Sequence, residues 1–227
     1  MTDKHEEQDI DIAEKLNEGR QFFEKFQKEI SIGVGVFVAL TAGIGYYLYS
    51  YIPTLEKEAQ AEIFYAQGHF ANDSFNLAMY GDNMGHFGFA DIIDNYGGTK
   101  SADLSNYYMG VCLMRTGDYE GAIDYLSDFG GNDKIVSSVA LGAIGDCYSE
   151  LQNDGKAFDY YMKAAKNNEN DFSTPLYLMK AGNISEALGD YDNAISAYEK
   201  IARDFPNSTE GREVKKYLAR AKAMQGS

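Results

Sequence analysis

The strongest pattern in the chain is an uninterrupted apolar run near its N-terminal end. Residues 30–52 read ISIGVGVFVALTAGIGYYLYSYI and contain no charged side chain. As a helix, this run is about 34 Å long at about 1.5 Å per residue, which is enough for a bilayer core of about 30 Å. It ends in several tyrosines, as membrane spans often do at the interface. We therefore predict a transmembrane helix over 30–52, and a buried core helix is the alternative.

The residues that flank this run predict its orientation. Several basic side chains precede the run, whereas only Lys57 follows it closely. The positive-inside rule then places the N-terminus in the cytoplasm and everything after Pro53 on the other side of the membrane. The apolar run and the segment before it are both too long for a cleaved signal peptide, so we predict an uncleaved anchor. The basic residues nearest before the run are Lys15, Arg20, Lys25 and Lys28.

The segment before the span, residues 1–29, is predicted to be cytoplasmic and amphipathic. Its apolar side chains fall on roughly one helical face, with charges opposite. This arrangement is typical of a helix that rests on a membrane surface or on a partner. The apolar residues are Ile12, Leu16, Phe23 and Phe26.

Small residues recur every four positions within the predicted span. Such a stripe lets another helix approach closely, and it predicts helix packing in the membrane, including the formation of a homo-oligomer. The alternative is the ordinary abundance of glycine and alanine in membrane helices. The stripe consists of Ser31, Gly35, Ala39 and Gly43.

After Pro53 the hydrophobic pattern becomes that of amphipathic helices, and it repeats. The phrase GDYEGAIDYL at 117–126 returns as GDYDNAISAY at 189–198, with NDGKAFDYYM at 153–162 between them. In each copy a glycine precedes an alanine by twelve residues, and successive copies are offset by 35 and 37 residues. This is the signature of the tetratricopeptide repeat (TPR), whose period is about 34 residues. The pairs are Gly110 and Ala122, Gly145 and Ala157, and Gly182 and Ala194.

These patterns together predict an all-α architecture. A single N-terminal transmembrane helix is followed by a TPR α-solenoid with three clear repeats, one degenerate repeat and a C-terminal capping helix. The three clear repeats occupy 103–207. A linker helix and the degenerate repeat precede them at 53–102, where the glycine-rich stretch 80–88 argues against a regular helix. A basic amphipathic helix over 208–227 is expected to cap the last repeat.

Charge and composition narrow the classes of function. The net charge is −15, and such an acidic chain repels a phosphate backbone, so we expect no nucleic-acid partner. Two cysteines and three histidines argue against a zinc site, and no nucleophile–base–acid set is present, so we predict no metal, no cofactor and no enzymatic activity. Cys112 and Cys147 are expected to be buried free thiols, and His69 and His86 ordinary surface or loop histidines.

The first helices of the repeats are predicted to line a groove for a protein partner. The predicted surface mixes apolar, aromatic and acidic side chains, so it suits a segment with apolar anchors and positive charge. It lacks the lysines with which some TPR domains hold a C-terminal carboxylate. Its predicted residues are Tyr107, Val111, Met114, Arg115, Asp146, Ser149, Glu150, Met179, Asn183 and Glu186.

The whole arrangement resembles one bacterial family, the ancillary subunit of the Sec translocon, whose TPR domain is shared with the cell-division coordinator group. The residues that carry the resemblance are QFFEKFQKEISIGVGVFVALTAGIGYYLY and the repeats at 103–207. The resemblance implies a bacterial inner-membrane protein with a periplasmic TPR domain. It also implies association with the translocon and contact with periplasmic chaperones or exported clients. The chain departs from the family in its acidity and in the glycine-rich segment 80–99.

The sequence therefore predicts a membrane-anchored TPR scaffold that mediates protein–protein interactions in protein export or envelope assembly. One alternative is a structural or assembly component of another envelope complex, for secretion or cell division, or a self-associating membrane scaffold. Another is a cytoplasmic TPR adaptor with the opposite orientation.

Overall fold

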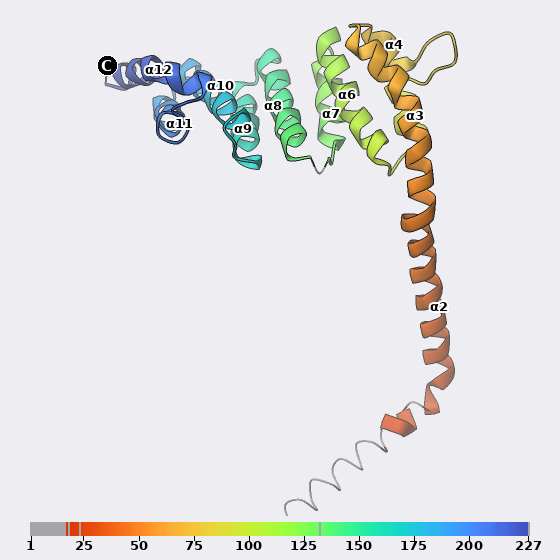
Figure 1. Cartoon of the computed structure of the whole chain (residues 1–227). Coiled ribbons are helices and arrows are strands. Elements are labelled where there is room, and N and C mark those ends of the chain that lie inside the picture. Colours follow the sequence, from red (N-terminus) through yellow and green to blue (C-terminus); the bar gives the residue numbers. More distant parts are fainter. Residues whose placement is uncertain (1–16, 18, 23, 132, 227) are drawn as a thin grey trace, which may run out of the picture. The chain divides into compact units, whose positions relative to one another are not determined.

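The computed structural model describes residues 17–226 except 18, 23 and 132. Within these residues the regular secondary structure is entirely helical, as the sequence predicts (Figure 1). The chain divides into two compact units, Met1–Thr54 and Leu55–Ser227.

In the first unit, the apolar run forms helix α2, Gln27–Tyr46, and a π-helical turn η1, Tyr47–Tyr51. The π-helical turn comes just before Pro53, which lacks an N–H group and whose ring crowds the carbonyl four residues earlier. A wider turn accommodates such a residue without breaking the helix. The N–H of Ile52 accordingly donates to the carbonyl of Tyr47, five residues back. Helical residues then continue as α3, Ile52–Ala71.

The helical run Gln27–Ala71 is long and apolar enough to cross a membrane, judged by length and composition. None of the residues of α2 is buried, so its apolar side chains have no protein core around them. The helix begins at Gln27, three residues before the predicted span. Of the apolar residues predicted for the segment before it, Ile12, Leu16 and Phe23 lie outside the described part of the chain.

The second unit is a stack of helical hairpins (Figure 1). Helix α6 packs on α7, α8 on α9, and α10 on α11, while contacts of α7 with α8 and of α9 with α10 join successive hairpins. Helix α12 packs on α10 and α11, in the place predicted for a capping helix. The bounds are α4 Phe75–Tyr80, α5 Phe89–Asn95, α6 Lys100–Thr116, α7 Tyr119–Asp128, α8 Lys134–Glu150, α9 Asp154–Asn167, α10 Ser173–Ala187, α11 Tyr191–Asp204 and α12 Thr209–Gln225.

The repeated glycine–aspartate phrase forms the turn inside each hairpin. Gly117 has a φ of 88° and Gly189 a φ of 74°, a left-handed conformation that ends the preceding helix and that glycine adopts without strain. The next residue in each copy, Asp118 or Asp190, caps the following helix by accepting a backbone N–H with its side chain. The middle copy has Gln152 in the left-handed conformation instead, followed by the cap Asn153.

The glycine of each first helix allows close contact with the second helix of the same hairpin. A Cβ added at Gly145 would lie 2.7 Å from the ring of Tyr161, and one at Gly182 would lie 2.3 Å from the ring of Tyr198. No such distance is tolerated between non-bonded heavy atoms, so these rings fit only against glycine. The regular spacing of glycine in the sequence therefore reflects where a large side chain of the second helix packs against the first helix.

Helix α3 takes the place predicted for the first helix of the degenerate repeat. Its Ala66 is buried in the same core as Phe89 and Ile92 of α5. The carboxylate of Glu56 accepts hydrogen bonds from the N–H and the hydroxyl of Ser101, 3.1 and 3.0 Å away, at the N-terminus of α6. The short helix α4 was not predicted, because six residues are too few for a periodic pattern to show.

The glycine-rich stretch after α4 is non-helical, as predicted, and it is held by one carboxylate. Asp82 Oδ1 accepts the backbone N–H groups of Met84 and His86, while Oδ2 lies 2.8 Å from His86 Nδ1 and 3.3 Å from His69 Nε2. The ring of Tyr65 stacks on that of His86, with centroids 3.8 Å apart. Both histidines, which were expected to be ordinary, therefore hold this loop against α3.

We expect Asp82→Ala to loosen this loop. The backbone N–H groups of Met84 and His86 lose their acceptor, so their hydrogen exchange should become roughly tenfold faster. The hydrogen bond from His86, followed by those from the backbone, lowers the pKa of Asp82 well below its usual range. The protection is therefore fully present above the ordinary pKa of aspartate and is lost only as the pH falls through the lowered pKa of Asp82.

Hydrogen exchange measured by mass spectrometry over 80–88 tests this expectation. The matched control is Asp94→Ala, since Asp94 is exposed on α5 and outside the loop. Equal exchange in the two variants would show that the carboxylate of Asp82 does not order the loop.

Candidate functional site

The largest group of predicted groove residues lines one cavity in the second unit. This cavity, of about 590 Å³, lies along helices α6, α8 and α10, and it also receives one side chain each from α7 and α9. We call it the α6–α8–α10 groove. Its lining residues are Tyr107, Val111, Met114, Arg115, Tyr119, Val139, Ala143, Asp146, Ser149, Glu150, Tyr161 and Lys180.

Seven of the ten residues that the sequence proposes for a partner-binding groove lie here. They come from two consecutive repeats, because positions one repeat apart fall side by side when hairpins stack. Their binding of a partner stays a prediction. The seven are Tyr107, Val111, Met114, Arg115, Asp146, Ser149 and Glu150.

The end of the groove formed by the first repeat is apolar and aromatic. Tyr107 is half-buried, and its ring lies 5.6 Å from that of Tyr108 and 5.7 Å from that of Phe129, so its position is fixed by packing. Burial raises the pKa of Tyr107, so its hydroxyl stays protonated at neutral pH. Val111 and Met114 lie on the same helix and remain half-exposed to the groove. This end offers apolar side chains with few polar groups among them.

The end formed by the second repeat is ionic. The carboxylate of Asp146 accepts a hydrogen bond from the buried Tyr161 hydroxyl at 2.7 Å, and Lys180 Nζ lies 2.6 and 2.8 Å from its two oxygens. The ammonium of Lys180 also lies 5.5 Å from the centroid of the Tyr161 ring. Burial, and then the hydrogen bond to Asp146, raises the pKa of Tyr161 well above its usual range, so the phenol remains a donor.

Lys180 and Tyr161 also line the groove, and the sequence reasoning did not include them among the groove residues. The available signal was spacing: Lys180 follows Asp146 by 34 residues, close to the repeat offsets of 35 and 37, so the two lie on neighbouring first helices. The lysine does not form a free carboxylate clamp, because Asp146 already binds its ammonium.

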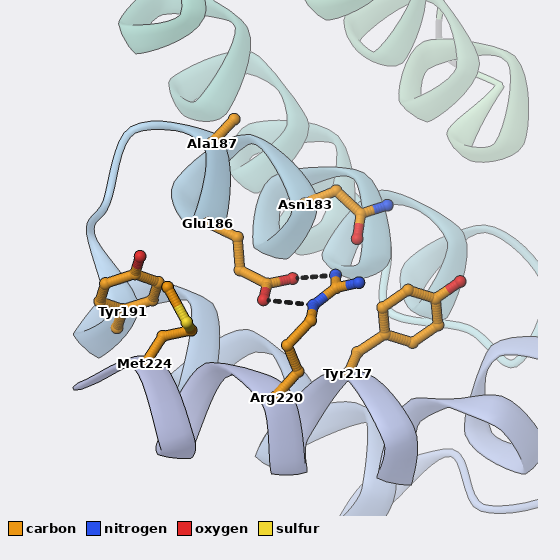
Figure 2. A pocket seen from close by; sticks show the side chains of 7 residues that line it. All are labelled: Asn183, Glu186, Ala187, Tyr191, Tyr217, Arg220 and Met224. Carbon is orange, nitrogen blue, oxygen red and sulfur yellow. Dashed lines mark hydrogen bonds and ion pairs between the residues drawn. The ribbon is translucent and has the colours of Figure 1, made fainter. Parts of the chain in front are cut away.

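Two other predicted residues line a second cavity of about 530 Å³ between α10 and α12 (Figure 2). Arg220 donates to both oxygens of Glu186, at 2.9 and 2.6 Å. The hydroxyl of Tyr198 lies 2.8 Å from Glu186 and 2.9 Å from Asn183. The hydrogen bond from Arg220 lowers the pKa of Glu186. This second cavity is lined by Asn183, Glu186, Ala187, Tyr191, Tyr217, Arg220 and Met224.

The remaining predicted groove residue, Met179, is not brought into either cavity. It is half-buried on α10 and packs against the core around Leu178 and Tyr198. The sequence placed it one turn before Asn183, but the side chains of a helix point to several faces, and Met179 packs against the core instead.

The small residues predicted to pack helices in a membrane lie on α2 and are all exposed: Ser31, Gly35, Ala39 and Gly43. A Cβ added at Gly35 or Gly43 would meet nothing within 4 Å. The stripe therefore leaves room for a second helix, and pairing along it stays a prediction.

Both cysteine side chains lie in the core of the second unit. Cys112 and Cys147 are buried free thiols, as predicted, and burial raises the pKa of each to about 12. Neither is therefore a thiolate nucleophile at neutral pH. Among the residues that the structure describes, no three His, Cys, Asp or Glu side chains are placed to hold a metal ion.

Comparison with known proteins identifies the repeats. One tetratricopeptide repeat family model matches residues 105–132 and 177–208, and a second one matches 139–171. No curated protein sequence matches the chain. The chain thus contains tetratricopeptide repeats, which mediate protein–protein interactions and scaffolding.

One solved structure shows a similar fold. The nearly identical TPR-like repeats of a Podosopora anserina protein described as a kinesin light chain align with a TM-score of 0.50 and 12% identity, over 78% of this chain and 89% of that one. Two crystal structures of MamA align with TM-scores of 0.49 and 0.40 and identities of 18% and 22%. These cover 74% and 61% of this chain and 92% and 89% of theirs.

Proposed function

We propose that this protein is a membrane-anchored TPR scaffold that holds a segment of a partner polypeptide in the α6–α8–α10 groove and serves protein export or envelope assembly. The observation that carries the proposal is the groove itself. It joins an apolar end to an ionic end on a repeat fold that binds proteins.

The size and lining of the groove suit a polypeptide segment. A cavity of about 590 Å³ accommodates a few side chains, within the range of about 300–1,000 Å³ usual for ligand sites. Tyr107 is a rigid aromatic anchor of the kind that dominates binding energy at protein interfaces. The helices that carry these residues are packed against neighbours on both sides, so the surface is largely preformed.

The membrane anchor is supported by the character of α2. The helix is apolar, exposes large side chains such as Val36, Phe37 and Leu40, and has no buried residue. A helix that is hydrophobic all round needs an apolar surrounding, and a bilayer supplies one. The distribution of Lys and Arg supports a cytoplasmic N-terminus, and the repeats then lie in the periplasm of a bacterial envelope.

The proposed partners follow from the family that the sequence resembles. They are the Sec translocon, reached through the span, and periplasmic chaperones or exported clients, reached through the groove. The resemblance covers the order of the elements, so this part of the proposal depends on architecture and on no individual binding residue.

Site-specific photocrosslinking in intact membranes tests the proposal. A photoreactive residue at Val111, in the groove, is expected to capture a polypeptide. The same residue at Asp124, exposed on α7 and outside the groove, is the matched control. Adding Tyr107→Ala should lower capture from Val111 by roughly tenfold, since an interface aromatic anchor contributes at least about 1.4 kcal/mol. Equal capture from Asp124, or no effect of Tyr107→Ala, would remove the groove from the proposal.

A second photoreactive position in the span, Ala39, distinguishes the export role from its alternatives. Capture of a translocon subunit supports the export role. Capture of a second copy of this chain instead supports a self-associating scaffold, for which the open space beside Gly35 and Gly43 leaves room. Capture of another envelope protein moves the role to a different assembly.

A further inference from the structure

Two ion pairs, one between the second and third repeats and one between the third repeat and α12, have the same sequence spacing but different exposure. Lys180 follows Asp146 by 34 residues, and Arg220 follows Glu186 by 34 residues. The side chain of Glu186 is 11% exposed, whereas that of Asp146 is 36% exposed. The two acids occupy different positions in their repeats, and the acid of one pair is nearly enclosed whereas the acid of the other is half-exposed.

The Glu186 pair is a structural contact. Both carboxylate oxygens of Glu186 accept from the guanidinium of Arg220, in the two-point geometry that arginine favours. Figure 2 shows the two side chains pointing at each other across the gap between α10 and α12. The buried Tyr198 donates to the same carboxylate. Removing Arg220 would leave a buried acid without its cation, so this pair fastens α12 to the stack.

The Asp146 pair differs because the carboxylate is held independently of its cation. The hydroxyl of the buried Tyr161 fixes Asp146 from its own repeat. Lys180 approaches from the groove, and 34% of its side chain is exposed there. Lysine is a compact charge on a flexible stem, and half-exposed pairs of this kind contribute little to stability. The ammonium can therefore leave while Tyr161 keeps the carboxylate in place.

A second carboxylate lies at the same end of the groove. Glu150, one turn after Asp146 on α8, lines the cavity, is exposed and forms no ion pair with a described residue. The one other cation among the lining residues is Arg115, on α6 in the neighbouring repeat. The chain as a whole has a net charge of −15, which favours the approach of a cationic segment over an anionic one.

We infer that the bound partner places a lysine or arginine side chain on the carboxylate of Asp146. In the free protein, Lys180 of the same chain occupies that position. This inference rests on the proposed function of the groove. The partner segment places apolar side chains over Val111 and Met114 and a basic side chain on Asp146 and Glu150. Asp146 is then a specificity-determining residue, Tyr161 positions it, and Lys180 competes for it.

Binding of three synthetic peptides to the full-length protein in nanodiscs tests the inference. Each is a fluorescein-labelled nonapeptide with the same leucine- and alanine-rich sequence, differing only at one central residue, which is lysine, uncharged norleucine or glutamate. Fluorescence anisotropy gives the dissociation constants. The wild-type protein should bind the lysine peptide most tightly, and added salt should weaken that preference.

Two variants with opposite expected effects make the test sharp. Lys180→Met removes the competitor while keeping the length of the side chain, so it should tighten binding of the lysine peptide by about fivefold and weaken that of the glutamate peptide. Asp146→Asn should abolish the preference for lysine over norleucine. The matched control Arg220→Met should leave the preference unchanged, because Arg220 lines the other cavity, and should lower the thermal unfolding temperature instead.

The outcomes separate the inference from the proposed function. If Lys180→Met leaves binding of the lysine peptide equal or weaker while all three peptides still bind, the inference is wrong and the groove function stands. If no peptide binds the wild-type protein, both are wrong. A thermal unfolding curve for each variant shows that it is folded, and Asp146→Asn, which keeps the shape of the side chain, decides the matter should Lys180→Met fail to fold.

Discussion

Replacing Tyr198 with alanine is expected to lower the free energy of unfolding by about 3–5 kcal/mol, the usual cost of removing a large buried aromatic side chain. The ring is fully buried and fills the space that Gly182 leaves open on α10. Its loss creates a cavity between α10 and α11. The core around it includes Ala194 and Ile201 of α11 itself and Val214 of α12, which are held by their own helices and cannot collapse fully into the space.

The hydroxyl of Tyr198 adds a polar contribution to this expected loss. It donates to Glu186, the acid that binds Arg220 of α12, and burial followed by that hydrogen bond raises the pKa of Tyr198 well above its usual range. Without the phenol, the nearly buried Glu186 loses a hydrogen bond that water replaces poorly. The variant should therefore loosen α12 as well as α11.

Chemical denaturation followed by circular dichroism measures this effect. Tyr198→Phe is the matched control, because it keeps the ring and removes only the hydroxyl, at a cost of about 1 kcal/mol. Hydrogen exchange should increase first in α12 and α11, before α6 and α8. A loss of less than about 1.5 kcal/mol for the alanine variant would mean that the ring is not a packing centre of the stack.

Replacing Val38 and Ile44 together with arginine is expected to release the protein from the membrane. Both residues lie on α2, and their side chains are exposed on an apolar helix. An arginine near the middle of a membrane helix costs about 2.5–3.5 kcal/mol on insertion scales, so two cost about 5–7 kcal/mol. That is enough to shift the protein from the membrane pellet to the soluble fraction.

Fractionation after alkaline extraction measures the release, and the double variant Val38→Leu with Ile44→Leu is the control that preserves an apolar surface. The second unit begins at Leu55, so its helical stack should keep its thermal unfolding in both variants. Retention of the arginine variant in the pellet would contradict the proposed anchor. It would then favour a partner protein that covers α2.

These proposals describe a scaffold with separable parts. In these proposals the α2 helix anchors the protein in the membrane, and the α6–α8–α10 groove binds the partner. The two ionic contacts of the last repeats have different proposed roles, one in stability and one in partner recognition. The Glu186 contact stabilises the end of the stack, and the Asp146 contact remains open enough to exchange its cation. A mutation in one part should therefore leave the functions of the other parts unchanged, so that each can be measured separately.

The sequence by itself determined the class of fold, because every local signal agreed with it. The glycine–aspartate phrase ends one helix and caps the next, as Gly117 and Asp118 do. The twelve-residue spacing of glycine and alanine reflects a contact inside a single hairpin, as between Gly182 and Tyr198. Such contacts are close in sequence, so periodicity alone reveals them. The apolar run also stands out without any tertiary information.

Only the tertiary structure decided which side chains meet across repeats. Asp146 and Lys180 belong to different hairpins, and their pairing depends on the stacking of α8 and α10. The same holds for His69 and His86, which share Asp82 in an irregular loop that no repeat pattern describes. Charge and burial follow from these long-range contacts. The sequence therefore predicted most of the residues that line the groove, whereas only the tertiary structure shows which charged groups of the groove are already paired.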